Sequence, residues 1–593
     1  MKIAILVKQV PVVAELELLP NGRLRRDGPS EMDPLSARAV AQGVLLAKQL
    51  GASTEAITLG PPSAAQVLRQ AILCGVDRGI LVSDASFKGS DTLATAQILK
   101  DVLLSQGPFD FVLAGDRSID GETGLVPRQI AALLGFNFAG NVVSLFDATD
   151  GSSLHLKSLA DDTTLTYKIN APVVFTCSER LCKPCKSTSH AWDTSMDHLI
   201  STVDAKSLKY TPLNLPTRTT DVVGVKQFQR SRFPRLFTTV EEGIEAAMDC
   251  IHRSLQTSHA STNHSPTTVS KNTHAETTLE DSSRQPYDIE IICITEGKDR
   301  VTDIHTLATA SQLASQIPAT LTVFHAGNGE VLEVPKETTK AYKISKHSSR
   351  SAAKEIANTI KNYVSAAVLI SDSSWGKEVS GYLSATLNAG VVGSVTEINA
   401  AKDIVGVKPN IDGTTFCDIA VTTSIKLFTV TPGAKEAAET TTVNLIDIVS
   451  REGLEGLEIL ERETTGTAVP LSRSKRVVAV GDGVLFEDIH IVEQLAGLLS
   501  AEIACTRRLA DKGWFPRSRQ VGITGTTISP DLYVAIGISG KLNHMIGALS
   551  SKIVLAINSD PNALIFDHCD VGIVLPYQHT LRALIKRLSA KRA

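Results

Sequence analysis

The chain has 593 residues, of which 43% are apolar and 21% charged, and its formal net charge is -4. This balance is typical of a globular protein and argues against a strongly basic, nucleic-acid-binding surface. The length exceeds the roughly 250 to 300 residues at which a single core stops growing, so we expect several domains. No apolar run approaches the roughly 18 residues of a membrane-spanning helix, and we expect a cytoplasmic protein.

Short apolar runs rich in β-branched residues alternate with helix-length amphipathic stretches in the first part of the chain. The five apolar residues that start at Ile3 are fewer than the roughly 7 to 15 of a signal-peptide core, so we expect a buried first strand there. Gly51 and Gly75 are expected to end two crossover helices. The rhythm predicts a parallel α/β sheet, with strands at 3–7, 55–59, 80–82 and 111–114 and helices at 36–50 and 64–73.

A polar segment rich in Ser, Thr, His and Asn interrupts this pattern, and we interpret 256–285 as a linker. Strands expected at 289–294, 319–324, 366–370 and 419–422 then begin a second α/β unit. A third unit opens at Arg476, where a strand runs into a Gly-containing turn. We therefore predict three parallel-sheet, nucleotide-binding-like α/β domains, at 1–255, 286–470 and 476–593.

Three cysteines have a spacing that occurs in some iron-sulfur sites: Cys177, Cys182 and Cys185, with Cys250 as a distant fourth. A cluster normally needs four well-placed thiolates, so we expect no metal here. The low density of nine cysteines in this length also indicates mostly reduced thiols.

The segment from Thr506 to Asp560 has the most ligand-binding features. Gly537 and Gly540 flank Ser539 directly after an apolar strand, and a turn of this kind at a helix N-terminus presents backbone N–H groups to an anion such as a pyrophosphate. A tight turn without a ligand gives the same pattern, and Arg507 alone is compatible with a surface ion pair.

Taken as a whole, this segment resembles the FAD-binding domain of the electron transfer flavoprotein large (alpha) subunit, a Rossmann-like, DHS-like domain. The shared motifs are Gln-Val-Gly-x-Thr-Gly from Gln520, Gly-Ile-Ser-Gly-x-x-x-His from Gly537, and Ile-Asn-x-Asp-Pro from Ile557. The resemblance implies that Arg507 lies against the isoalloxazine ring, that Thr524 bonds near its reactive nitrogen, and that a positive or donating His544 faces the pyrimidine end. The residues implied to bind FAD are Arg507, Gln520, Val521, Thr524, Gly525, Gly537, Ser539, Gly540, His544, Asn558 and Asp560.

The front of the chain resembles the small (beta) subunit of the same family, so we interpret the protein as the two subunits fused in one chain. Val7-Lys8-Gln9-Val10-Pro11, Met32-Asp33-Pro34, Gly60-Pro61 and the loop from Gly115 to Thr123 carry this likeness. In the family these loops surround AMP, or a second FAD in electron-bifurcating members. An alternative is that Asp120 and Thr123 only cap a helix. The candidate residues for this second nucleotide are Val7, Gln9, Asp33, Gly60, Asp120, Gly121 and Thr123.

The resemblance implies an electron carrier without catalytic residues of its own. It would accept electrons from flavin dehydrogenases, such as the acyl-CoA dehydrogenases of fatty acid β-oxidation, and pass them to a quinone oxidoreductase or another acceptor. Near the expected partner-recognition loop, Trp192 is an aromatic candidate for the interface. Two alternatives remain: an NADH-dependent bifurcating flavoprotein with a second FAD, and a nucleotide-binding regulatory protein without redox activity. The sequence departs from the family motifs at Ile523, Thr526, Asn543 and Pro576, which bears on flavin affinity and potential, and the departures at Ile523, Thr526 and Pro576 make the regulatory alternative conceivable.

Overall fold

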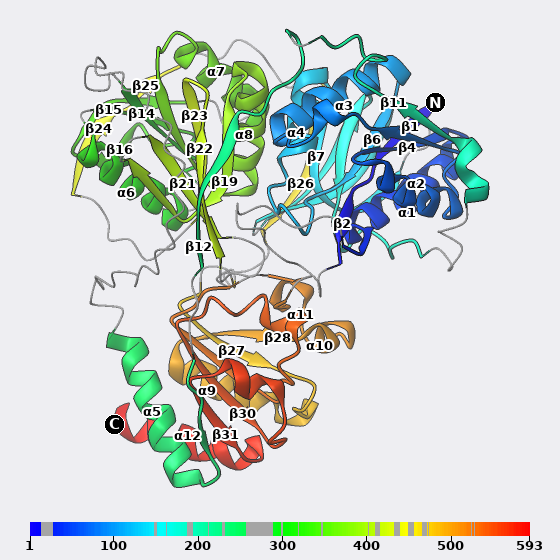
Figure 1. Cartoon of the computed structure of the whole chain (residues 1–593). Coiled ribbons are helices and arrows are strands. Elements are labelled where there is room, and N and C mark those ends of the chain that lie inside the picture. Colours follow the sequence, from blue (N-terminus) through cyan, green and yellow to red (C-terminus); the bar gives the residue numbers. More distant parts are fainter. Residues whose placement is uncertain are drawn as a thin grey trace, which may run out of the picture. The chain divides into compact units, whose positions relative to one another are not determined.

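The computed structural model describes residues 1–592 except for 13–27, 148–150, 162, 187–193, 212, 228–231, 257–288, 298–299, 318, 345–347, 401–402, 410–414, 432–438, 449–455, 465–470, 472–473, 523–524 and 527. The chain forms two compact units (Figure 1). The larger unit contains 1–226, which we call the first half, and 287–411 with 415–466, which we call the second half. The C-terminal unit contains 227–286, 412–414 and 467–593. Within the described residues, no helix is both long and apolar enough to cross a membrane.

The first half is built on a ten-stranded sheet with the order β11-β5-β4-β1-β6-β10-β7-β8-β9-β26. The strands from β11 to β7 pair in parallel, and those from β7 to β26 pair antiparallel. The elements of this half are β1 (Lys2–Leu6), β2 (Gln9–Pro11), β3 (Ser30–Met32), α1 (Pro34–Leu50), β4 (Ser53–Leu59), α2 (Ala65–Leu73), β5 (Arg78–Val82), α3 (Thr92–Gln106), β6 (Phe111–Gly115), α4 (Leu125–Leu134), β7 (Asn137–Asp147), β8 (Ser153–Ala160), β9 (Thr163–Asn170), β10 (Val173–Cys177), β11 (Ile200–Val203) and β12 (Thr220–Gln227).

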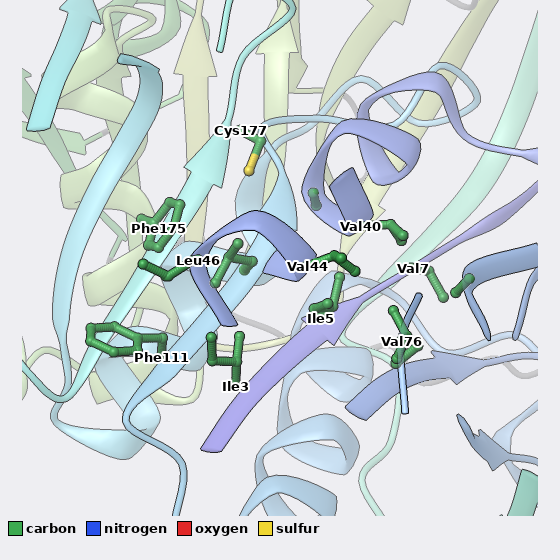
Figure 2. Packing of buried hydrophobic residues seen from close by; sticks show 14 of the residues in the cluster. Ile3, Ile5, Val7, Val40, Val44, Leu46, Val76, Phe111, Phe175 and Cys177 are labelled. Carbon is green, nitrogen blue, oxygen red and sulfur yellow. The ribbon is translucent and has the colours of Figure 1, made fainter. Parts of the chain in front are cut away.

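Both faces of the parallel part of this sheet are covered by helices, which explains the continuous apolar run of β1. Ile3, Ile5 and Val7 point to one face and pack with α1, as Figure 2 shows around Val44. The alternate residues Ala4 and Leu6 belong to the core under α3 and α4. Burial of a side chain such as Ile5 contributes roughly 1.5 to 3 kcal/mol, so this strand is well anchored.

The second half contains a seven-stranded sheet with the order β19-β23-β18-β14-β15-β17-β25, in which all described pairs are parallel. Helices α7 and α8 cover one face, and α6 covers the other. The elements are β14 (Ile289–Thr295), α6 (Arg300–Gln316), β15 (Ala319–His325), β16 (Val331–Pro335), β17 (Thr338–Lys343), α7 (Ser349–Ile360), β18 (Ala366–Ser371), α8 (Ser374–Leu387), β19 (Gly390–Val395), β20 (Glu397–Ala400), β21 (Ile404–Pro409), β22 (Thr415–Val421), β23 (Ile425–Val430), β24 (Thr440–Asn444), β25 (Ile446–Asp447) and β26 (Leu457–Thr464).

The two halves of the larger unit exchange strands. From the second half, β26 pairs antiparallel with β9 and becomes the edge of the first sheet. From the first half, β12 joins the four-stranded sheet β12-β22-β21-β20 of the second half. Helices α4 and α8 also pack against each other, with Gln129 Nε2 donating to Ser384 Oγ at 2.9 Å. Each half therefore contributes a strand to a sheet of the other half.

The C-terminal unit is a six-stranded parallel sheet with the order β13-β31-β30-β29-β27-β28. Its first strand and one helix come from the middle of the chain, and the rest follows residue 475. The elements are β13 (Arg235–Phe237), α5 (Val240–Gln256), β27 (Arg476–Val480), α9 (Ile489–Leu499), β28 (Glu502–Cys505), α10 (Arg507–Asp511), β29 (Leu532–Ile536), α11 (Leu542–Met545), β30 (Ile553–Asn558), β31 (Val571–Val574) and α12 (Tyr577–Arg592).

The α/β class with mostly parallel sheets is confirmed, but the chain divides differently from the three domains that we predicted. We placed 1–255 in one domain, whereas the structure joins β13 and α5 to the C-terminal unit. The reason is that Ile244, Ala247 and Ile251 form an apolar face on α5 that is buried in the core of that unit. The predicted linker at 256–285 lies almost wholly outside the described residues.

Candidate functional site

The carboxyl edge of the C-terminal sheet brings several of the predicted residues together. The strand order reverses between β27 and β29, and all described pairs are parallel, so the carboxyl ends of the strands share one edge. Open α/β sheets bind ligands at this edge, near the reversal. Arg507 follows β28, Gly537 follows β29, and Asn558 ends β30.

Two glycine turns meet at this reversal. Gly537 has a φ of +62°, and a Cβ added to Gly481, after β27, would lie 2.1 Å from the carbonyl oxygen of Gly537. Gly540 has a φ of +77°, and a Cβ there would lie 2.0 Å from the Ile565 nitrogen. Close backbone packing therefore requires glycine at these positions, whether or not an anion binds beside them.

The turn from Gly537 to Gly540 also offers donors to an anion. Ser539 is exposed, and within the described part of the chain no group accepts a hydrogen bond from the backbone nitrogen of Ser539 or Gly540. We expected a helix N-terminus to assist this turn, but α11 has only 4 residues and adds little dipole. The donors are thus the N–H groups of the turn itself, as in backbone nests that bind anions.

A second loop, 519–526, lies beside β28. The Val521 nitrogen donates to the Cys505 carbonyl at 3.0 Å, and the Thr526 nitrogen donates to the Gln520 carbonyl at 2.8 Å. A Cβ on Gly525 would lie 2.4 Å from that same Gln520 oxygen. Gln520, Val521 and Gly525 therefore shape the loop through their backbones. Thr524 lies outside the described residues, so its predicted contact stays a prediction.

His544 is buried, and the protein occupies both of its ring nitrogens. Its Nε2 lies 2.7 Å from the Tyr533 hydroxyl, and its Nδ1 lies 3.1 Å from the Val521 carbonyl oxygen. Because a carbonyl oxygen only accepts, Nδ1 carries the proton and Nε2 accepts from Tyr533. Burial lowers the pKa of His544 to about 4, so the ring is neutral at physiological pH. The ring therefore donates to the Val521 carbonyl and is not positive. Its predicted place at the pyrimidine end of the flavin stays a prediction.

Arg507 has the environment expected of a residue available to a ligand. Its side chain is 61% exposed, and it forms an ion pair with Asp511 at 3.6 Å, one helical turn away. The neighbouring Arg508 is engaged differently, because its guanidinium donates to Asp482 at 3.0 Å. Of these two neighbouring arginines, Arg507 is therefore the one less committed to the protein.

The two predicted residues after β30 have structural partners of their own. Asn558 Nδ2 donates to the Ile538 carbonyl at 2.9 Å and thereby ties β30 to the glycine turn of β29. Asp560 is exposed, and its carboxylate accepts from the Asn562 nitrogen at 3.0 Å. Asn558 thus fixes the turn, whereas Asp560 retains acceptor capacity for a ligand.

The residues at this edge fit a large anionic cofactor such as FAD. Thr506 directly precedes Arg507. Its Oγ1 is buried and has no hydrogen-bond partner among the described residues. A buried hydroxyl without a partner costs roughly 1 to 3 kcal/mol, which a bound polar ligand would recover. Together with the N–H groups of Ser539 and Gly540, it provides donors around one strand edge.

The sheet of the first half has a reversal of strand order of the same type. Its strand order reverses between β1 and β6, where β4 and β5 continue on one side and β10 on the other. Val7 and Gln9 follow β1, Gly60 follows β4, and the loop 116–124 follows β6. Val7 itself belongs to the core, as Figure 2 shows, so only its backbone can serve a ligand. Gln9 Nε2 donates to Ser30 Oγ at 2.8 Å.

The loop 116–124 is held at several points by residues of the first half. Asp33 accepts from the Leu35 and Ser36 nitrogens as the N-cap of α1, and its other oxygen accepts from the Ile119 nitrogen at 2.9 Å. Lys8 Nζ forms an ion pair with Asp120 at 2.6 Å and donates to Ser118 at 3.0 Å.

This arrangement decides one alternative for the loop. The N-cap of α4 is Gly124, without a side-chain capping bond, so the interpretation that Asp120 and Thr123 cap this helix is wrong.

Arg128, on α4, closes the two ends of this loop. Its guanidinium donates to the Gly124 carbonyl and lies 3.2 Å from the Asp116 carboxylate. Burial raises the pKa of Asp116, but Arg128 and a hydrogen bond from Thr176 outweigh it and hold that pKa below its usual value. Glu378, on α8 of the second half, lies on the same side, and burial raises its pKa. Arg128, Asp116 and Glu378 therefore form a charged cluster that connects the loop of the first half with α8 of the second half.

The sequence analysis missed Lys8, Arg128, Thr506 and Tyr533 as residues of these sites. Lys8 had a usable signal, because it is a charge placed directly after a buried strand at the point of reversal. Arg128 and Tyr533 are identified by side-chain contacts, to the loop ends and to His544, and Thr506 by the burial of its hydroxyl. None of these features is visible in the sequence. Trp192, the predicted aromatic of a partner interface, lies outside the described residues.

The cysteine spacing does not correspond to a metal site in the described part of the chain, where no three His, Cys, Asp or Glu side chains are placed to share an ion. Cys177 is buried, and burial raises its pKa well above the usual value. Cys182 donates to the Arg38 carbonyl. Cys250 belongs to the C-terminal unit, in the buried face of α5.

Comparisons with known proteins identify the family of the chain. A model described as electron transfer flavoprotein domain matches residues 22–208 and 294–450, and one described as electron transfer flavoprotein FAD-binding domain matches 470–549. Relatives include the "Putative electron transfer flavoprotein subunit YdiR" of Escherichia coli (strain K12), 33% identical over 248 residues, which are 40% of this chain and 78% of the relative. Protein FixB of Rhizobium meliloti (strain 1021) is 31% identical over 222 residues, 35% of this chain and 62% of FixB.

The match over 470–549 covers the part of that edge formed after β27, β28 and β29, and indicates FAD as the cofactor of the C-terminal unit. The other model, in two parts, covers more than half of the chain and takes in both halves of the larger unit. The chain therefore belongs to the electron transfer flavoprotein family.

Proposed function

We propose that the protein carries electrons from reduced flavin dehydrogenases, such as acyl-CoA dehydrogenases, to a quinone oxidoreductase or another acceptor. The observation that carries this proposal is the match of 470–549 to an FAD-binding domain at an edge where the Ser539 and Gly540 N–H groups and Arg507 are available. FAD supplies the redox chemistry when bound, because it can accept and release electrons. The chain supplies the binding, orientation and electrostatics.

The positive charge of this site comes from Arg507. A guanidinium stays protonated at every relevant pH, so it favours the negative charge of a reduced flavin. His544 cannot share this role, since its Nδ1–H is used by the Val521 carbonyl and its pKa is lowered to about 4 by burial. We propose instead that the Tyr533–His544–Val521 chain of hydrogen bonds holds the 519–526 loop in shape beside the flavin.

For the first half we propose a second nucleotide, AMP or FAD, at the reversal between β1 and β6. The loop 116–124 supports it, because Lys8 and Asp33 hold this loop at the carboxyl edge of the sheet. The side chains of the loop are also not used to cap α4. The bifurcating alternative is favoured by one observation, the likeness of Ser118-Ile119-Asp120-Gly121-Glu122-Thr123 to the corresponding loop of bifurcating members.

Anaerobic electron transfer tests the proposal. The purified protein is mixed with a catalytic amount of an acyl-CoA dehydrogenase and its substrate, and the visible flavin absorbance is followed; the carrier reading predicts bleaching that is reversed by an electron acceptor. In a second cuvette NADH alone is added. Bleaching by NADH without a dehydrogenase would favour the bifurcating alternative, and no bleaching in either cuvette would contradict both.

A further inference from the structure

Lys408 is a half-buried cation of the second half that contacts the 116–124 loop of the first half. It lies on β21, and its Nζ donates to the Gly121 carbonyl oxygen at 2.8 Å. Gly121 is one of the residues of the proposed N-terminal nucleotide site. The contact therefore joins a strand of one half to the ligand loop of the other, across 287 positions of sequence.

The environment of Lys408 leaves its charge only partly satisfied. An ammonium has three donors, and in the described part of the chain the Gly121 carbonyl is the acceptor of one of them. Burial lowers the pKa of Lys408, while the Glu122 and Asp372 carboxylates favour its charged form from a distance. Asp372 is already engaged by Ser394, Thr429 and Lys377. An ammonium that is partly withdrawn from water gains stability when a further acceptor or an anion completes its hydrogen bonds.

The backbone of the loop also requires external support. Glu122 has a φ of +51°, in the left-handed region that non-glycine residues seldom adopt. Its nitrogen donates to the Ser118 carbonyl at 2.9 Å, which closes a five-residue turn from Ser118 to Glu122. Lys408 holds the Gly121 carbonyl directly before that strained position and thereby fixes the orientation of the turn.

We propose that Lys408 is a positioning residue for the N-terminal nucleotide site, contributed by the second half. It fixes the Gly121 peptide of the Ser118–Thr123 turn and places a positive charge beside the anionic phosphate of the nucleotide. This inference rests on the second nucleotide of the proposed function. Through Lys408, occupancy of a site in the first half depends on a strand of the second.

The chain offers a matched control in Lys426, on β23 of the seven-stranded sheet of the same half. Lys426 Nζ also donates to backbone carbonyls, those of Val421 and Thr423, and lies 3.5 Å from Asp403. All of these partners belong to the second half. Lys426 thus shares the kind of contact but has no described contact with the loop.

The experiment compares the full-length wild-type protein with Lys408→Met, Lys408→Arg and Lys426→Met. FAD and AMP released per chain are counted, and AMP binding to protein stripped of nucleotide is measured by calorimetry. We expect Lys408→Met to bind AMP at least about tenfold more weakly, the loss of one charge-assisted contact. Lys408→Arg should restore most of the affinity, and Lys426→Met should match the wild type. All four proteins should keep the FAD of the C-terminal unit, which shows that they fold.

Two results would overturn the inference, and they are distinguishable. If the wild type binds AMP or a second FAD and Lys408→Met binds it equally well, Lys408 has no part in the site. If the wild type has one FAD, no further nucleotide and no calorimetric response to AMP, the N-terminal site itself is refuted, and the inference fails with it.

Discussion

At the scale of single residues, the hydrogen bonds of His544 decide how the charges of the flavin site are distributed. Sequence motifs identify the histidine but not its protonation, because this depends on Tyr533 and Val521, whose partnership arises only in the fold. Arg507 is then a candidate for the positive charge, because among the described residues its exposed side chain forms an ion pair with Asp511 alone. The motif thus predicted where the site lies better than what each residue does.

The buried neutral His544 predicts a loss of stability in acid. Its folded pKa of about 4 lies below the ordinary 6.5, so the unfolded chain binds the proton more tightly. Stability is complete above pH 6.5 and falls as the pH drops toward 4. Relative to His544→Gln, the wild type should lose about 2 kcal/mol of unfolding free energy between about pH 7.5 and about pH 5. Urea titrations measure this difference, and parallel pH curves for the two proteins would refute the assignment.

Arg507 and Arg508 form a natural pair of test variants. Arg507→Gln should lower the reduction potential of the bound FAD, because a positive charge near the reduced flavin is lost. Its effect on stability should stay within about 0.5 kcal/mol, since an exposed ion pair contributes little. Arg508→Gln, which removes the contact to Asp482, should leave the potential unchanged. Spectroelectrochemical titration measures both; equal shifts for the two variants would show that Arg507 has no special position.

At the scale of elements, parallel strands and their crossover helices could be predicted from sequence, and the exchanged elements could not. The runs from Ile3, Phe111 and Ile289 are apolar because helices cover both faces of their sheets, and α1 ends at Gly51 with a φ of +62°. By contrast, β26 and α5 have ordinary amphipathic sequences that do not reveal which sheet they join. Chain order assigned α5 to the first domain, whereas its apolar face packs on the C-terminal core.

The α5 arm should therefore determine the stability of the FAD-binding unit. Ile251 is 2% exposed in that core, and Ile251→Ala should cost about 2 to 5 kcal/mol and weaken FAD retention. Leu255 lies on the same helix but is 44% exposed, so Leu255→Ala should cost no more than about 0.5 kcal/mol. Thermal unfolding followed by release of flavin fluorescence separates the two variants. Equal, small effects would mean that α5 is not part of the unit.

At the scale of the whole molecule, the exchanged elements interlock the two subunit-like parts of the chain. The part of the chain before 257 contributes β12 to the second half, and β13 with α5 to the C-terminal unit. The part after 288 contributes β26 to the sheet of the first half. Arg232 adds an ion pair to Asp570 and a hydrogen bond to the Ser551 carbonyl. Association of the two parts therefore does not depend on the covalent connection between them.

Cleavage of the connection tests this interlocking. A protease recognition sequence placed within 257–288 should allow the chain to be cut into two fragments that stay together in native gel filtration. The fragments should separate only in denaturant, and the cut protein should keep its FAD. A control protein without the recognition sequence shows that the protease attacks nowhere else. Spontaneous separation of the fragments after cleavage would contradict the exchanged-strand arrangement.

The central claim is that the C-terminal unit binds FAD as a redox cofactor, and the most direct measurement counts the flavin. The full-length protein is denatured after purification, and the released FAD is quantified per chain. The comparison is Gly540→Val, in which the added side chain would clash with the backbone of Ile565. The account predicts at least one FAD per wild-type chain and a large loss in the variant. A wild-type protein that contains no flavin, and binds none when FAD is added, would contradict it.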